Sequence, residues 1–162
     1  MRSRFEHFSF GISAIYRYIQ KIERDEMIQY GFRGAYAQYL AAMNRYPDGL
    51  TATQLGDICD KDKAAVSRIV ADMEDKGLVR RENTRTNAYR ARLKLTEEGK
   101  KAADYVCRRA QAAVDAAGQD LSEEERHIFY ASLDRIASRL QTISREGIPP
   151  RTNIQNKEGE SV

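Results

Sequence analysis

The sequence has no tryptophan, two cysteines, two histidines and three prolines. Cys59 and Cys107 lie far apart in the chain and are too few for a disulfide framework or a cysteine-rich zinc site. A cysteine on an apolar helical face is usually a small core residue, and a peroxide-sensing thiol is the alternative at either position. His7 and His127 have no cysteine or carboxylate ligand set at metal spacing. We therefore expect no metal and no cofactor.

The sequence also lacks long apolar runs. None approaches the ~18 consecutive apolar residues that span a bilayer, and the N-terminus lacks the basic-then-apolar order of a signal peptide. Neither a phosphate-cradling glycine loop nor a Ser-His-Asp arrangement is evident. These absences predict a cytoplasmic protein that has no membrane partner and is not an enzyme.

The chain has 162 residues, of which 41% are hydrophobic and 31% charged. This length suits one compact domain, and the abundance of Ala, Glu, Arg and Lys favours helix. We expect a single domain over residues 1–147. Residues 148–162 are polar and are expected to form a disordered tail.

Positive charge is concentrated in the middle of the chain. Residues 61–94 carry ten basic and five acidic side chains, a net charge of +5, whereas the whole chain carries only +3. A concentrated basic segment is expected where a protein binds phosphates, and an ordinary solvated surface is the alternative when charge is considered alone.

Apolar residues recur at helical spacing in several segments, which predicts amphipathic helices. The stripes are Phe5, Phe8, Ile12, Ile15, Ile19 and Ile22; Phe32, Tyr36, Leu40 and Met43; Ala103, Val106, Ala110, Ala113 and Ala117; and Phe129, Leu133, Ile136, Leu140 and Ile143. Three of these stripes lie at the two ends of the chain, and one small core cannot bury them all. We therefore expect a homodimer, joined through helices at about residues 5–23 and 97–146.

The middle of the chain has the pattern of a helix-turn-helix. Thr51 and Gln54 form a capping box that opens a short helix, and Asp60 and Lys61 break it. Asp62 can cap a second helix, which is predicted to end at Gly77. The apolar stripe of that helix is Val66, Ile69, Val70 and Met73.

A predicted β-hairpin follows the second helix. Residues 78–82 and 89–95 are the two strands, and in the second strand apolar residues alternate with Arg90, Arg92 and Lys94. The intervening residues are polar and basic. Helix, turn, helix and hairpin together predict a winged helix-turn-helix over about residues 50–96.

This order of elements, from about Phe5 to Ser144, resembles the MarR family of winged-helix transcription regulators. The matching text is LTATQL at residues 50–55, DKAAVSRIV at 62–70, MEDKGLV at 73–79 and LKLTEEG at 93–99. The resemblance implies a mainly helical fold with a small β-hairpin wing and N- and C-terminal dimerisation helices.

The resemblance also implies where DNA binds. The family places the second helix, here Asp62 to Lys76, in the major groove. The implied contacts on this helix are Lys63, Ala64, Ser67 and Arg68. An internal salt bridge is the alternative role for Arg68. The implied wing contacts are Arg85, Asn87 and Arg90. The family commonly carries Asp-x-Arg at the wing tip, and Asn87-Ala88-Tyr89-Arg90 lacks that carboxylate.

A cavity for a small aromatic or phenolic effector is implied between the helical part and the winged unit. Its candidate lining residues are Tyr16, Phe32, Arg33, Tyr36 and Tyr39, for which a plain core role is the alternative. The predicted function is a DNA-binding transcription regulator of a pseudo-palindromic operator, a repressor released by a small molecule. A winged-helix scaffold for protein interaction or dimerisation, without specific DNA binding, is the alternative.

Overall fold

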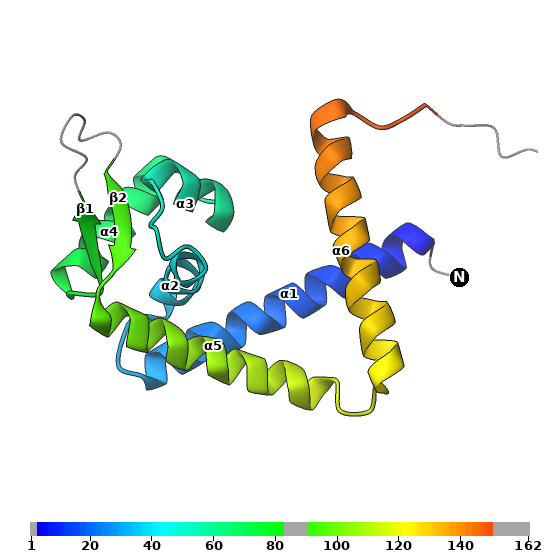
Figure 1. Cartoon of the computed structure of the whole chain (residues 1–162), viewed down its shortest axis with the longest axis horizontal. Helices are drawn as coiled ribbons and strands as arrows, with labels where there is room; N and C mark the ends of the chain where they lie inside the picture. Colours follow the sequence, from blue (N-terminus) through cyan, green and yellow to red (C-terminus); the bar gives the residue numbers. More distant parts are fainter. Residues whose placement is uncertain (1–2, 83–90, 151–162) are drawn as a thin grey trace, which may run out of the picture. The chain divides into compact units, whose positions relative to one another are not determined.

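The computed structural model describes residues 3–82 and 91–150, and these residues divide into two units between Ala116 and Ala117 (Figure 1). The first unit contains α1 (Arg4–Gln29), the 3-10 helix η1 (Gly34–Tyr36), α2 (Ala37–Asn44), α3 (Ala52–Cys59), α4 (Lys63–Asp75), β1 (Val79–Glu82), β2 (Arg92–Leu95) and α5 (Glu97–Ala117), and the second contains α6 (Glu123–Glu146). The predicted fold class, mainly helical with one hairpin, is confirmed. The predicted tail falls largely on residues 151–162, outside the described residues.

The first helix is longer than the sequence predicts. A capping box opens it, since the Ser3 hydroxyl accepts from the Glu6 N–H at 3.1 Å and the Glu6 carboxylate accepts from the Ser3 N–H at 2.8 Å. The helix continues past Ile22 to Gln29, and its last turns bury Met27 in the core. The next predicted helix starts later than expected, because Arg33 has an extended backbone (ψ 131°) and η1 intervenes before α2.

The helix-turn-helix forms as predicted. Thr51 and Gln54 cap α3 reciprocally, at 3.2 Å and 2.9 Å. Asp60 adopts a left-handed conformation (φ 51°), which ends α3 and turns the chain. The Asp62 carboxylate then accepts a hydrogen bond from the Ala65 N–H at 2.8 Å and opens α4.

The hairpin pairs β1 with β2 in antiparallel register, from Val79 opposite Leu95 to Glu82 opposite Arg92. Leu50 adds a bridge to Leu93, and the two residues exchange backbone hydrogen bonds of 3.1 and 2.7 Å. This bridge ties the start of the helix-turn-helix to the hairpin. The second strand begins at Arg92; its predicted start at Tyr89 lies outside the described residues.

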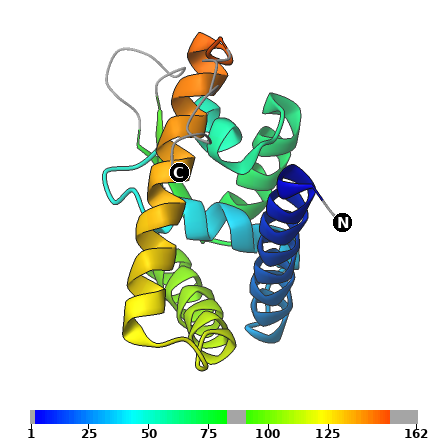
Figure 2. The same ribbon diagram turned by 90° about the vertical axis from the view of Figure 1, so that its right-hand side faces the viewer.

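One core holds the first unit together. Helix α2 contacts α1, α3 and β2 and lies between α1 and the winged part (Figures 1 and 2). The largest fully buried side chains are Met27, Tyr36, Leu40, Leu55, Val66, Val70, Met73, Leu78, Leu93 and Val106. Burying a side chain of this kind contributes about 1.5–3 kcal/mol. The core therefore fixes α4 and the hairpin against the same scaffold.

The entry into α5 depends on close backbone contact. A Cβ at Gly99 would lie 1.9 Å from the Leu78 carbonyl oxygen, so only glycine fits there. The Thr96 hydroxyl donates to the Gly77 carbonyl at 2.6 Å and accepts from the Gly99 N–H at 3.0 Å. These contacts explain physically why threonine and glycine occupy positions 96 and 99 of the LKLTEEG motif.

The terminal stripes have different surroundings. Ala103, Val106 and Ala110 of α5 are buried in the first unit, so this part of the predicted dimerisation stripe serves the core. A Ser122–Glu125 capping box opens α6, and this helix has no buried residue. Within residues 3–82 and 91–150, every helix is too short or too polar to cross a membrane.

Candidate nucleic-acid interface

Helix α4 separates a buried side from an exposed side. Val66, Val70 and Met73 face the core, whereas all the residues that sequence reasoning assigned to DNA on this helix are exposed. These are Lys63, Ala64, Ser67 and Arg68. A donor such as Ser or Arg on an exposed helix face can hydrogen-bond base edges or phosphates.

Arg68 lies on the exposed face of α4. Among the residues that the structure describes, no carboxylate lies within 4.0 Å of its guanidinium, so the alternative of an internal salt bridge is not realised there. Its charge does act on Asp62: the Ala65 N–H, the Ala64 N–H and the nearby Arg68 lower the pKa of the Asp62 carboxyl. The guanidinium therefore remains available to an external acceptor.

The cations of the two strands are engaged within the protein. Arg81 makes a two-oxygen contact to Glu74 of α4 at 2.9 and 3.0 Å. Glu82 accepts from Lys94 at 2.9 Å and pairs with Arg80 at 2.8 Å, and the hydrogen bond from Lys94 is the main cause that lowers its pKa. Arg92 donates to the Gly49 carbonyl at 3.0 Å.

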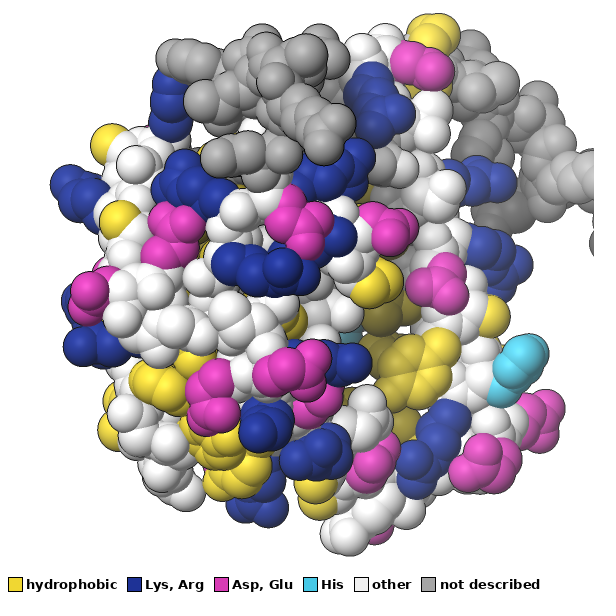
Figure 3. Space-filling view, turned by 60° about the vertical axis from the view of Figure 1, so that its left-hand side comes forward, with side chains coloured by type: hydrophobic (Ala, Val, Ile, Leu, Met, Phe, Trp, Pro, Cys, Tyr) yellow, Lys and Arg dark blue, Asp and Glu magenta, His cyan; other side chains and the backbone are white. Residues whose placement is uncertain are grey.

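These pairs reduce the net charge available to a ligand. Lys and Arg side chains alternate with Asp and Glu over the winged end of the molecule (Figure 3). Part of the positive charge that residues 61–94 carry is therefore engaged in ion pairs within the hairpin and between the hairpin and α4. Arg85, Asn87 and Arg90, the candidates in the wing, lie outside the described residues.

An ion pair joins α4 to the segment before η1. The Arg33 guanidinium donates to the Asp72 carboxylate and lies 5.9 Å from the Tyr36 ring centroid. The Tyr36 hydroxyl is buried beside this pair, and among the described residues it makes no hydrogen bond of standard geometry. The Tyr36 hydroxyl and the Arg33 guanidinium lower the pKa of Asp72. Sequence reasoning missed this contact because the two residues are 39 positions apart.

The five candidate effector residues do not form one site. Phe32, Arg33 and Tyr36 lie together, with the two ring centroids 6.4 Å apart, but the Tyr36 side chain is core. Tyr39 is also core. Tyr16 is 59% exposed on α1, where its hydroxyl accepts from Gln20 at 2.7 Å.

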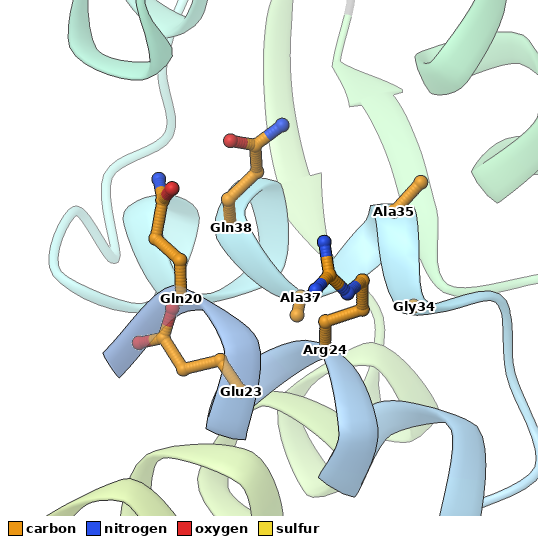
Figure 4. A pocket seen from close by; sticks show the side chains of 7 residues that line it. All are labelled: Gln20, Glu23, Arg24, Gly34, Ala35, Ala37 and Gln38. Atoms are coloured by element: carbon orange, nitrogen blue, oxygen red, sulfur yellow. The ribbon is translucent and has the colours of Figure 1, made fainter. Parts of the chain in front are cut away.

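A cavity of about 260 Å³ lies elsewhere, between α1, η1 and α2 (Figure 4). Its lining residues are Gln20, Glu23, Arg24, Gly34, Ala35, Ala37 and Gln38. None of the five aromatic-site candidates is among them. Polar residues on the outer face of a helix look like ordinary solvated surface in sequence, which is why sequence reasoning passed over Gln20, Glu23 and Arg24.

The two cysteines are poor candidates for redox chemistry. Burial raises the pKa of Cys59 to about 11. Burial and the charge of Glu23 also raise the pKa of Cys107. Reactive thiols have a lowered pKa, so both side chains fit the structural interpretation better. The described residues contain no group of His, Cys, Asp and Glu arranged to hold a metal ion.

Comparison with known proteins agrees with this geometry. Residues 30–88 match the model of the MarR family. None of the curated proteins compared matches the chain in sequence.

Solved structures share the fold. A MarR family transcriptional regulator from Silicibacter pomeroyi is 22% identical, with a TM-score of 0.70 over 93% of this chain and 100% of its own. A regulator of that family from Listeria monocytogenes, complexed with 26mer DNA, is 19% identical and has a TM-score of 0.72. The match covers 94% of this chain and 100% of the Listeria chain. A MarR regulator from Methanosarcina mazei is 24% identical and has a TM-score of 0.73. The match covers 88% of this chain and 94% of the Methanosarcina chain.

The three solved structures are described as transcriptional regulators, and at these identities what this chain shares with them is the fold. The resemblance inferred from the sequence is therefore confirmed: residues 30–88 match the MarR family, and the chain has the winged-helix fold of that family's transcriptional regulators.

Proposed function

We propose that this protein is a homodimeric, sequence-specific regulator of transcription that binds double-stranded DNA through α4 and the hairpin. The observation that carries the proposal is the exposed face of α4, where Ser67 and Arg68 lie opposite the buried Val66, Val70 and Met73. The Listeria regulator, which shares the fold, was solved with DNA, and this supports the same role here.

Dimerisation is supported by apolar side chains that the two units leave exposed. On α1 these include Phe5 at 76%, Phe10 at 64% and Ile15 at 49% exposure, and on α6 Ile128 at 56% and Leu140 at 50%. Monomeric proteins rarely expose contiguous apolar patches of this kind. A second copy of the chain would cover them and would present two α4 helices to one DNA.

A two-fold dimer should read a pseudo-palindrome whose half-sites are about one helical turn apart. Repression is the proposed outcome of binding, and a small molecule that alters the position of α4 is the proposed release signal. The ion pair between Arg33 and Asp72 supports the proposed release by a small molecule, because it links α4 to the residue that precedes Gly34 in the cavity wall.

The test is selection of bound sites from a pool of genomic fragments, followed by mobility-shift assays at several salt concentrations. Two winged units should neutralise roughly six to ten phosphates and give a log-log salt slope of about −5 to −9. The retrieved sites should share a pseudo-palindrome. Absence of binding even at low salt would favour the alternative, a winged-helix scaffold without specific DNA binding, for which the internally paired hairpin cations are the supporting observation.

A further inference from the structure

Two opposite charges of α1 line the cavity between α1, η1 and α2. Glu23 is half-buried and Arg24 is exposed, and both line the cavity. In the part of the chain that the structure describes, neither forms an ion pair within 4.0 Å, although neighbouring charged residues of α1 do: Lys21 with Asp25, and Glu26 with Arg109. The positive charge of Arg45 interacts with the Glu23 carboxylate over a longer distance than that of an ion pair.

The stem of the exposed Arg24 side chain packs against Gly34. A Cβ at Gly34 would lie 2.3 Å from the Arg24 Cγ and 3.0 Å from the Arg24 carbonyl oxygen, so the stem of Arg24 occupies the space that any other residue at position 34 would fill. Figure 4 shows the guanidinium rising from α1 beside Ala37, the Glu23 side chain extending from the preceding position toward the base of Gln20, and the Gln38 side chain rising from α2. A packed stem holds an arginine at lower entropic cost when it binds an anion.

The rest of the lining combines polar and apolar groups. Gln20 and Gln38 offer amide donors and acceptors, and Gly34, Ala35 and Ala37 keep the walls small. No aromatic side chain is among the lining residues. The volume of about 260 Å³ is below the range of about 300–1,000 Å³ that is usual for drug-sized ligands.

From these observations we infer that the cavity binds a small zwitterion of the α-amino acid class. The ligand carboxylate pairs with Arg24, its ammonium group pairs with Glu23, and the two glutamine amides bind the remaining polar atoms. A flat aromatic acid would leave Glu23 unpaired and close to a second negative charge, which disfavours it.

The site is placed to influence DNA binding. Gly34 forms part of its wall and directly follows Arg33, whose guanidinium is bonded to Asp72 of α4. An occupant that shifts Gly34 would therefore act on the contact that holds α4. This regulatory step rests on the proposed function, whereas binding of the zwitterion does not.

The experiment is isothermal titration calorimetry of the full chain with each of the standard amino acids as probe. For every amino acid that binds, the amine lacking its carboxylate and the acid lacking its amino group are titrated as well. We expect at least one amino acid to bind once per chain, and both truncated analogues to bind at least about tenfold more weakly. Failure of all the amino acids to bind, or equal binding of either analogue, would overturn the inference.

Two variants locate the site, and one serves as a control. Glu23→Gln and Arg24→Gln should each weaken binding about tenfold or more, and circular dichroism should show that both remain folded. Arg17→Gln, which makes the same charge change as Arg24→Gln on the same helix but outside the cavity, should bind like the unaltered protein. Unchanged affinity in both Glu23→Gln and Arg24→Gln would refute the assignment.

A mobility-shift assay in parallel separates the two proposals. If the chain binds amino acids but no DNA, the proposed function fails and the zwitterion site stands. If it binds DNA but no amino acid, the zwitterion site fails and the proposed function stands.

Discussion

At the scale of single residues, two kinds of polar contact have different tasks. Ser67 and Arg68 project from α4 away from the core, and their roles depend on an external partner. Arg33, Arg81 and Arg92 instead hold parts of the first unit together through contacts to Asp72, Glu74 and the Gly49 carbonyl. Replacing a member of the first group should change DNA binding, and replacing one of the second should change stability.

Ser67→Ala and Arg68→Ala should each cost about 1–3 kcal/mol of binding free energy on the preferred site and relax base preference at defined positions. The measurement is equilibrium binding to the operator and its single-base variants. Lys101→Ala, which removes a positive charge from an exposed position on α5, is the matched control and should leave base preference intact. If neither α4 variant changes affinity or preference, α4 is not the reading helix.

Asp72 should make stability depend on pH in the acid range. Its pKa is lowered in the folded protein by the Tyr36 hydroxyl and by Arg33. A carboxyl group with a depressed folded pKa stabilises the fold above its unfolded pKa, and this contribution is lost as pH falls through the folded value. Urea unfolding should therefore show Asp72→Asn less stable than the unaltered protein at neutral pH.

This difference should shrink as pH falls below about 4, where the carboxyl group becomes protonated in the unaltered protein too. Asp75→Asn, at an exposed position on α4 whose nearest cation, Lys76, is 4.0 Å away, is the control. A difference that stayed constant down to acid pH would show that the ion pair is not its cause.

At the scale of helices and strands, local chemistry could be predicted and distant contacts could not. The capping boxes at Thr51 and Ser122 and the cap at Asp62 depend on residues three positions apart, so the sequence contains the whole interaction. The extension of α1 beyond Ile22 was missed because charged residues interrupt the apolar stripe before Met27.

The candidate site divides in the same way. The exposed face of α4 follows from helical periodicity alone, and it was predicted. The Arg33–Asp72 pair depends on the packing of α4 near η1, and the cavity around Arg24 depends on the packing of α1, η1 and α2, so tertiary contacts between separate elements create both. Tyr36 and Tyr39 were predicted as ligand contacts with core as the alternative, and the structure places both in the core.

Gly99→Ala should destabilise the first unit. The added Cβ would meet the Leu78 carbonyl oxygen at 1.9 Å and push α5 away from the hairpin, for which we expect a loss of about 1–3 kcal/mol. Glu98→Ala, at the exposed neighbouring position, should stay within about 0.5 kcal/mol. Denaturant unfolding monitored by circular dichroism measures both. Equal stability of the two variants would contradict the close approach.

At the scale of the whole molecule, the apolar surface of α6 tests the proposed dimer. Leu140 is 50% exposed in one chain, so Leu140→Asp would have little effect on a monomer. In a dimer that buries this side chain, the unpaired carboxylate should cost several kcal/mol and dissociate the assembly. Gln141→Asp, at the neighbouring exposed position, is the control.

Analytical ultracentrifugation at micromolar concentration should find two chains for the unaltered protein and for Gln141→Asp, and one for Leu140→Asp. An unaltered protein that sediments as a monomer and still binds its operator tightly would contradict the dimer.

Sequence-specific binding is the central claim, and its most direct test compares two affinities at one salt concentration. The dissociation constant is measured on the selected pseudo-palindrome and on a shuffled duplex of the same length and composition. Phosphate contacts are equal on both, so any difference comes from reading the sequence or its shape. We predict that the selected site binds about 10³-fold or more tightly than the shuffled duplex. Equal affinity for the two duplexes would contradict the proposed function.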